Sequence, residues 1–145
     1  MTSDSYPDGL IKKILQETKV IAMVGASEKP ARDSNKIMAF LQREGYRVIP
    51  VNPGLAGKQI HGETVYASLA DIPQEVTGHI DMVDVFRNSE AALSATKDAI
   101  AIGADTVWMQ LGVVNDEAAK LARDAGLQVV MNRCPAIELP RLRRD

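Results

Sequence analysis

Residues 25–35 combine residue types that could bind a phosphate group. Gly25 ends an apolar run, and a glycine at that point lets the backbone turn tightly and approach an anion. The helix predicted to follow would present unpaired N–H groups to the anion, and Lys29 and Arg32 add positive charge beside it. The dinucleotide-binding fingerprint has three glycines where this segment has one. The segment therefore fits either a phosphate-binding loop or an ordinary strand-to-helix turn with a serine cap.

The end of the second apolar run, at Val51, lacks the acidic residue that dinucleotide sites usually carry there. Such sites place Asp or Glu about 20 residues after the glycines to bind the adenosine ribose. Here Asn52 and Pro53 occupy that position, and Lys58 follows. An uncharged amide next to a lysine suits an adenosine ligand that carries an additional phosphate. The alternative is a Pro-Gly turn that leaves the sheet.

Two further segments place polar groups after apolar runs. Arg87 could hold a phosphate with both arms of its guanidinium, and Phe86 could cover an adenine or an alkyl chain. Singly, such residues are more often a strand-end ion pair and a core aromatic. Gln110 and Gly112 offer an amide and an open backbone across which a peptide-like chain could lie, whereas Trp108 is expected in the core.

No catalytic or metal-binding set is visible in the sequence. Cys134 follows the last apolar run, where it could meet another thiol, but a small buried core cysteine is the preferred interpretation. His61 lies in a glycine-bounded loop and His79 precedes the third run. Neither has a serine or carboxylate at a spacing that would make a nucleophile–base pair. There is no Cys/His cluster with zinc-binding spacing.

The elements that must position these residues alternate between strands and helices. Apolar runs predict five strands, and because the runs are nearly continuous they favour a parallel sheet covered on both faces. The strands are expected at 20–24, 47–51, 80–85, 106–109 and 128–131. Helices are expected at 10–15 after a cap at Asp8, from Ser34 or Asn35 to Gly45, at 89–102, and from an Asn115 cap to Gly126. Residues 54–73 are expected to be a loop with at most a short helix at 68–71.

This order predicts an α/β fold: one Rossmann-like, doubly wound parallel sheet of about five strands with flanking helices. Ligands of such sheets bind outside the carboxyl ends of the strands. All of the segments described above, 25–34, 52–58, 86–88, 110–115 and 132–135, follow predicted strands. The sequence therefore places its candidate binding residues along one edge of the sheet.

Composition is typical of a single domain over residues 1–145, with a short flexible N-terminus and a charged, solvated C-terminal tail at 141–145. The chain has 17 Lys plus Arg against 19 Asp plus Glu, and 4% aromatic residues, which argues against nucleic acid as a partner. One cysteine fits a reducing compartment. No apolar run approaches the roughly 18 residues of a membrane span, and the N-terminus lacks signal-peptide features, so we expect a cytoplasmic protein without a membrane partner.

Several segments occur in an order that resembles a known family. They are Val-Gly-Ala-Ser-x-x-Pro at 24–30 with Ser34 after it, Val-Asn-Pro at 51–53, Gly-x-x-Ile-x-Gly at 57–62, Val-Phe-Arg at 85–87, Gln-x-Gly at 110–112 and Arg-Cys-Pro at 133–135. Together they resemble the small stand-alone CoA-binding proteins, whose fold is similar to the N-terminal CoA-binding domain of the succinyl-CoA synthetase α subunit. The resemblance extends from about Leu10 to Ile137.

The resemblance implies coenzyme A, or an acyl-CoA, as the ligand. The loop of Gly25, Ala26 and Ser27 would hold a CoA phosphate, with Arg32 and Ser34 nearby. Asn52, Pro53 and Lys58 would border the adenosine 3′-phosphate, while Val85, Phe86, Arg87, Gln110 and Gly112 would flank the middle of the ligand and its pantetheine arm. The phosphorylated histidine of the synthetase belongs to a second domain that has no counterpart here, so a non-catalytic binding protein is expected.

The charge of the ligand agrees with this interpretation. CoA carries about four negative charges near neutral pH, and Lys29, Arg32, Lys58 and Arg87 could meet them. Three alternatives remain open from the sequence: an NAD(P)-dependent oxidoreductase of the Rossmann type, a ligase-like subunit that works with a partner chain, and a structural or protein-interaction role. The sequence does not identify a protein partner.

Overall fold

A five-stranded parallel sheet forms the centre of the computed structural model, which describes residues 6–143. The strands are β1 (Val20–Val24), β2 (Arg47–Val51), β5 (Met82–Val85), β6 (Thr106–Met109) and β7 (Gln128–Val130). Their order across the sheet is β2-β1-β5-β6-β7, and every neighbouring pair is parallel. The predicted doubly wound α/β sheet is thus confirmed, with the third strand beginning two residues later than expected.

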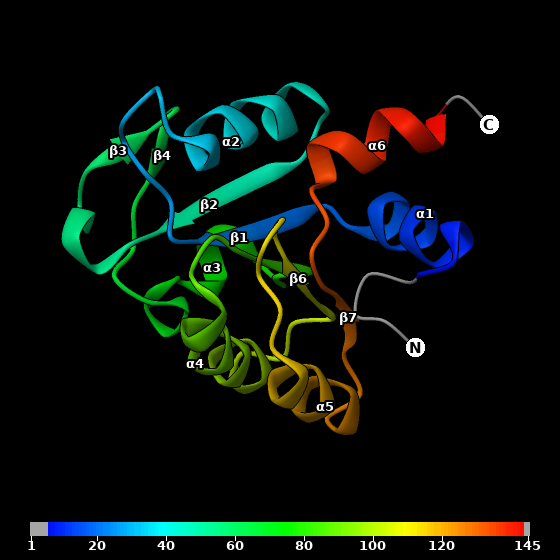
Figure 1. Cartoon of the computed structure of the whole chain (residues 1–145). Coiled ribbons are helices and arrows are strands. Elements are labelled where there is room, and N and C mark those ends of the chain that lie inside the picture. The colour runs from blue at the N-terminus through cyan, green and yellow to red at the C-terminus, as the bar shows by residue number, and fades with distance from the viewer. Residues whose placement is uncertain (1–5, 144–145) are drawn as a thin grey trace.

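Helices cover both faces of this sheet, as Figure 1 shows. One face carries α1 (Asp8–Glu17), α2 (Asp33–Arg43) and α6 (Pro135–Arg143); the other carries α4 (Ser89–Ala101) and α5 (Asp116–Asp124). All residues of β5 and β6 are buried, which explains why the apolar runs show no alternation. No helix within residues 6–143 has the length and apolar character needed to cross a membrane.

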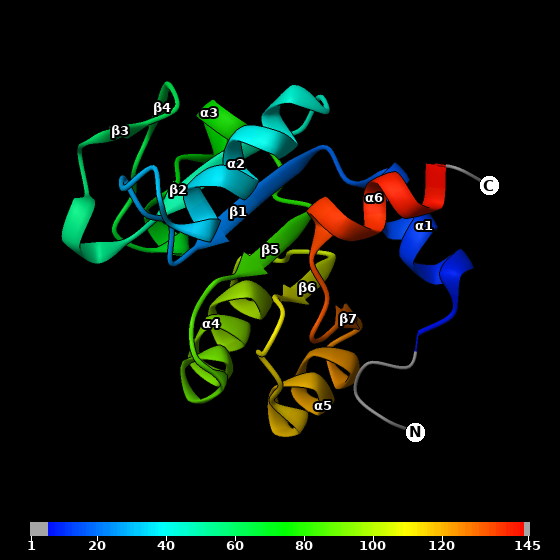
Figure 2. The same cartoon turned by 45° about the horizontal axis from the view of Figure 1, so that its top comes forward.

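The sheet has a topological switch point between β1 and β5. The chain passes from β1 to β2 on one side, then returns to place β5 on the other side of β1. The connections after β1 and β5 therefore leave toward opposite faces of the sheet, which opens a crevice at the carboxyl ends of these strands. Figure 2 shows the arrows of β1, β5 and β6 pointing toward the same edge, away from α1 and α6.

Two of the four predicted helix starts are corrected by the structure. The Asn115 side chain caps α5 as expected, with Oδ1 accepting from the N–H of Ala118 at 2.9 Å. Asp8, however, lies inside the first turn of α1, which follows Pro7 and has no side-chain cap. Helix α2 begins at Asp33 and follows Arg32 without a side-chain cap, so Ser34 and Asn35 lie inside its first turn, where both are buried.

The segment expected to be a loop at 54–73 contains more structure than predicted. It includes two short 3-10 helices, η1 (Pro53–Leu55) and η2 (Leu69–Asp71), and an antiparallel hairpin of β3 (Gln59–Ile60) and β4 (Glu63–Thr64). The 3-10 helix η2 confirms the short helix predicted at 68–71. Strands of two residues are too short to produce a detectable apolar pattern, and the four-residue helix α3 (Gln74–Thr77) was missed for the same reason.

The C-terminal residues are helical rather than a solvated tail. Helix α6 extends to Arg143 and buries Leu139 and Leu142 against the sheet face. Arg141 forms ion pairs with Asp8 of α1 at 3.0 Å and with Glu138 at 2.8 Å. The two leucines give this charged segment a buried side, so the prediction of a solvated tail was wrong for the residues up to Arg143. Residues 1–5, where the predicted flexible N-terminus begins, and the last two residues of the predicted tail lie outside the described residues.

Candidate ligand-binding site

Two adjoining clefts lie at the carboxyl edge of the sheet. The phosphate-loop cleft, of about 660 Å³, is lined by Gly25, Ala26, Ser27, Glu28, Lys29, Ala31, Arg32, Asp33, Ser34, Asn52, Gly54, Leu55 and Phe86. The amide cleft, of about 430 Å³, is lined by Asp33, Ile37, Phe86, Arg87, Asn88, Gln110, Leu111, Val113 and Cys134. Asp33 and Phe86 belong to both, so the clefts could hold two parts of one long ligand.

Gly25 brings the loops after β1 and β5 into direct contact. Its φ angle is +90°, and a Cβ atom at this position would lie 2.2 Å from the carbonyl oxygen of Phe86 and 3.0 Å from Cδ of Arg87. The Gly25 N–H donates to the Val51 carbonyl at 3.0 Å. Only glycine fits between these three loops, and the missing Cβ leaves room for the Arg87 side chain to lie beside it.

Asn52 joins the loops that follow β1 and β2. Its Nδ2 group donates to the carbonyl of Ala26 at 2.8 Å, and its Oδ1 accepts from the N–H of Gly54 at 2.9 Å. Both ends of the amide are thus engaged within the protein. The side chain supports the phosphate-loop cleft and lacks the charged pair of acceptor oxygens with which an acid binds a ribose.

The phosphate-loop cleft has groups suited to an anion. Helix α2 starts beside it without a side-chain cap, which leaves the positive end of the helix available. Lys29, Arg32 and Arg87 form no ion pair with any carboxylate in residues 6–143. Lys58, in contrast, lies 3.5 Å from Glu28 on the rim. Two of these three cations, Lys29 and Arg32, line the phosphate-loop cleft together with two carboxylates, and Arg87 lines the adjoining amide cleft.

The structure reveals a buried carboxyl group that was not among the predicted site residues. Asp84, counted within an apolar run, is fully buried in β5, and its Oδ1 accepts from Nε2 of Gln110 at 2.7 Å. Its Oδ2 is enclosed and accepts no hydrogen bond. Burial raises the pKa of Asp84 from 3.8 to about 7, against the lowering effect of the Gln110 hydrogen bond. The available signal was an acid inside an otherwise apolar strand.

Cys134 lines the amide cleft but is 4% exposed, so the prediction of a buried cysteine is confirmed. Burial raises the pKa of its thiol, although the backbone N–H groups of Ala136 and Ile137 lower it. A thiol with a raised pKa is mostly protonated near neutral pH and is a poor nucleophile. The buried position of Trp108 is confirmed as well; its Nε1 donates to the carbonyl of Arg133 at 2.8 Å.

The structure brings most of the predicted site residues to these clefts, and contact with a ligand stays a prediction for all of them. Those that line a cleft are Gly25, Ala26, Ser27, Arg32, Ser34, Asn52, Phe86, Arg87 and Gln110. Pro53, Lys58, Val85 and Gly112 line neither. Val85 is fully buried in the opposite core because it alternates with Asp84 along β5. The Gly112 N–H donates to Oδ1 of Asn132 at 2.7 Å.

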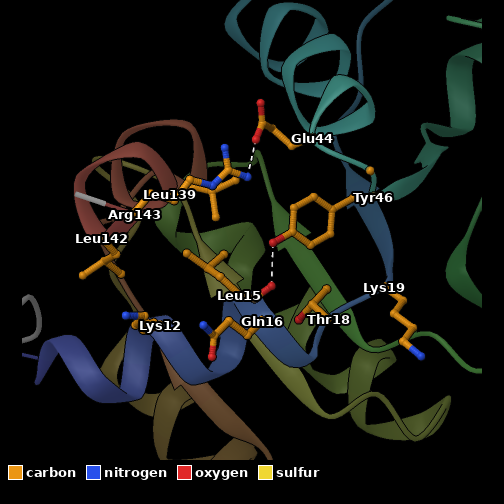
Figure 3. Close-up of a pocket in the computed structure, with 11 residues that line it drawn as sticks. Lys12, Leu15, Gln16, Thr18, Lys19, Glu44, Tyr46, Leu139, Leu142 and Arg143 are labelled. Carbon is orange, nitrogen blue, oxygen red and sulfur yellow. Dashed lines mark hydrogen bonds and ion pairs between the residues drawn. The ribbon is translucent and has the colours of Figure 1, made fainter. Parts of the chain in front are cut away.

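A third cavity, of about 340 Å³, lies at the opposite edge, near the amino ends of β1 and β2. Figure 3 shows Tyr46 pointing toward Leu15 and Arg143 toward Glu44. The Tyr46 hydroxyl donates to the Leu15 carbonyl, and Arg143 pairs with Glu44. These polar groups are thus engaged within the protein, and the cavity lies away from the switch point where α/β sheets bind ligands.

Both histidines lie outside the two clefts at the carboxyl edge. His61 Nε2 is 2.9 Å from Oδ1 of Asn35. His79 lies close to Asp81 and Asp105 at the amino ends of β5 and β6, where its Nε2 lies 3.0 Å from Asp105 Oδ2 and 4.0 Å from Asp81 Oδ1. Their ligand atoms lie within 4.8 Å of one another, a proximity that the spacing in the sequence did not indicate. A hydrogen bond between the imidazole and the Asp105 carboxylate accounts for this proximity.

Comparison with known proteins gives consistent results. The family described as CoA binding domain matches residues 19–140. The YneT protein of Bacillus subtilis (strain 168) is 38% identical over 124 residues, or 86% of this chain and 87% of that protein. A hypothetical protein from Pyrococcus horikoshii OT3 has a solved structure that is 42% identical, with a TM-score of 0.88, and the match covers 96% of this chain and 94% of that chain.

A more distant structural similarity involves a large enzyme. Acetyl-coenzyme A synthetase 1 of Ca. Korarchaeum cryptofilum, described as dinucleotide forming, superimposes on 77% of this chain with a TM-score of 0.63 and 22% identity. The matched part is 25% of that enzyme. At this level of identity the similarity concerns the fold alone.

Proposed function

Because the chain belongs to the CoA binding domain family, we propose that it binds coenzyme A, or an acyl-CoA, without catalysing a reaction. Family membership confirms the resemblance found in the sequence. The proposal rests on one observation above all: two clefts at the switch point of the sheet adjoin at Asp33 and Phe86, and free cations border them. A long ligand with several phosphates at one end and an uncharged arm at the other matches this arrangement.

The ligand would lie across both clefts. Its phosphates would meet the start of α2 and the side chains of Arg32 and Arg87, because these groups are positively charged and have no carboxylate partner among residues 6–143. The adenosine 3′-phosphate end would face the loop after β2 and Lys58. The pantetheine arm would extend past Phe86 into the amide cleft, toward Gln110 and Cys134.

The non-catalytic part of the proposal is supported by the residues around the clefts. Neither histidine lines them. The raised pKa of Cys134 makes this thiol a weak nucleophile, and within residues 6–143 neither His61 nor His79 is hydrogen-bonded to it. General acid–base or covalent catalysis needs a positioned proton-transfer group or an activated nucleophile. Asp84, whose pKa is about 7, is enclosed, and its one side-chain hydrogen bond within residues 6–143 is to Gln110.

Coenzyme A is expected to bind about 10- to 100-fold more tightly than dephospho-CoA, because the loss of the 3′-phosphate removes charge-assisted hydrogen bonds. Isothermal titration calorimetry with CoA, acetyl-CoA, dephospho-CoA, NAD, NADP and ATP measures this preference. The affinity for CoA should also fall as the salt concentration rises, since the contacts are ionic. Tight binding of NAD combined with no binding of CoA would refute the proposal and favour the oxidoreductase alternative.

Arg87→Ala is expected to weaken CoA binding about tenfold, since a guanidinium–phosphate contact is a charge-assisted hydrogen bond. Lys97→Ala is the matched control: it also removes an exposed cation, but from α4 and outside both clefts. The same calorimetric titration applied to both variants measures the effect. If the two variants bind CoA equally well, Arg87 is not part of the site.

A further inference from the structure

Burial of the Asp84 carboxyl group opposes folding. An ionisable side chain that is fully buried loses its hydration, and its Oδ2 recovers no hydrogen bond in return. A buried polar atom without a partner is rare in folded proteins and calls for an explanation. The only hydrogen bond that the Asp84 carboxyl group accepts within residues 6–143 comes from Gln110, which lines the amide cleft. Asp84 is therefore one side chain away from the site.

The backbone of Gln110 is held on both sides. Its N–H donates to the carbonyl of Val85 at 3.3 Å, and its carbonyl accepts from the N–H of Val113 at 2.9 Å. The side chain is 4% exposed, so it has little room to move. The main freedom that remains is the orientation of its terminal amide, which determines whether Nε2 or Oε1 faces Asp84.

Asp84 restricts that orientation when it is ionised. Above its pKa of about 7 the carboxylate only accepts hydrogen bonds, so it holds the Nε2 group of Gln110 and disfavours the orientation in which Oε1 would face it. Oε1 accepts no hydrogen bond within residues 6–143, and, unlike Oδ2 of Asp84, it is not enclosed. Gln110 lines the amide cleft, and with Nε2 bonded to Asp84 its Oε1 is the amide atom left to accept a hydrogen bond from a ligand.

We propose that Asp84 is a positioning residue that presents Oε1 of Gln110 to the amide cleft, where it accepts a hydrogen bond from a secondary amide of the ligand. The pantetheine arm of CoA contains such N–H groups, so this inference rests on the proposed function. It assigns to Asp84 and Gln110 the recognition of the arm, whereas Arg32 and Arg87 recognise the phosphates.

The test compares CoA with adenosine 3′,5′-bisphosphate, which keeps the adenosine and the 3′-phosphate but lacks the arm. Calorimetric titrations at pH 8 use the wild-type protein, Asp84→Asn and Gln110→Met. The asparagine amide has both a donor and an acceptor, so the amide of Gln110 can adopt either orientation beside it. We expect each variant to bind CoA about 3- to 10-fold more weakly and to bind adenosine 3′,5′-bisphosphate as the wild-type protein does.

The double variant Asp84→Asn/Gln110→Met separates positioning from a general structural role. If Asp84 acts only through Gln110, the double variant binds CoA no more weakly than Gln110→Met alone. Asp81→Asn, which alters a carboxyl at the opposite edge of the sheet, should leave both ligands unaffected. If Asp84→Asn does not fold, Gln110→Met still tests whether Gln110 recognises the arm, and unchanged CoA affinity in that variant overturns the inference.

Two results would overturn the inference and leave the proposed function intact: unchanged CoA affinity in Asp84→Asn and Gln110→Met, or equal losses for CoA and adenosine 3′,5′-bisphosphate. The second result would assign these residues to the fold in general. Failure of the wild-type protein to bind CoA would instead refute the proposed function itself, and the inference with it.

Discussion

Gly25→Ala is expected to lower the free energy of unfolding by roughly 3 kcal/mol, which corresponds to a decrease of roughly 10 °C in Tm for a chain of this length. Two effects add. An alanine at φ +90° is strained, and its Cβ would overlap the Phe86 carbonyl oxygen at 2.2 Å. That oxygen belongs to the backbone after β5, so relief of the overlap requires two loops to separate. Both loops border the phosphate-loop cleft, and CoA binding should be lost as well.

Urea denaturation measures the change, and Gly57→Ala is its matched control. Gly57 has nearly the same φ angle, +88°, but nothing lies within 4 Å of its added Cβ. This control should therefore show only the conformational penalty, about 1 kcal/mol. If Gly25→Ala is no less stable than Gly57→Ala, the contact between the loops after β1 and β5 is not rigid.

Relative to the wild-type protein, Asp84→Asn is expected to have a higher free energy of unfolding at high pH than at low pH. The ordinary pKa of an aspartate, 3.8, applies to the unfolded chain, and burial raises the pKa of Asp84 to about 7 in the folded protein. The folded state thus holds the proton more firmly. The contribution of this proton to stability is complete below about pH 4, and it is lost as the pH rises to 7. A pKa difference of one corresponds to about 1.4 kcal/mol, so the total loss is roughly 4 kcal/mol.

Asparagine cannot ionise, so the free energy of unfolding of Asp84→Asn minus that of the wild-type protein should increase between pH 4 and pH 8. Urea denaturation of both proteins across this range measures the difference. The new amide also changes stability by an amount that is the same at every pH, and this constant does not affect how the difference varies with pH. Asp71→Asn, which alters an exposed carboxyl on η2, is the control and should show no comparable increase. A constant difference for Asp84→Asn would mean that Asp84 is equally hydrated in both states.

The architecture was predictable because strands buried on both faces must be apolar along their whole length. Residues 20–24, 47–51 and 106–109 match observed strands to the residue. Once these strands are recognised as parallel, the segments that follow them must gather at one edge, and nine of the proposed site residues line a cleft there. Elements without a long apolar pattern, such as the β3–β4 hairpin, left no comparable signal.

Asp84 was missed because the apolar pattern around it is strong. Within residues 80–85 it lies among apolar neighbours, and the pattern was interpreted as a continuous run. Its significance depends on Gln110, which is 26 positions away in the chain but 2.7 Å away across adjacent strands. Likewise, the amphipathic character of residues 135–143 becomes evident only when Leu139 and Leu142 are seen against the sheet.

The amino-acid sequence by itself thus determined the order of strands and helices, the sheet edge at which the candidate residues gather and the family to which the chain belongs, because these properties follow from local periodicity and from motifs contiguous in the chain. The tertiary structure alone decided which side chains are free to bind and which are already engaged: Asn52 and Lys58 are held by neighbours, Val85 faces the opposite core, and Asp84 orients Gln110. These facts depend on the register and facing of strands that are distant in sequence, which local patterns do not encode.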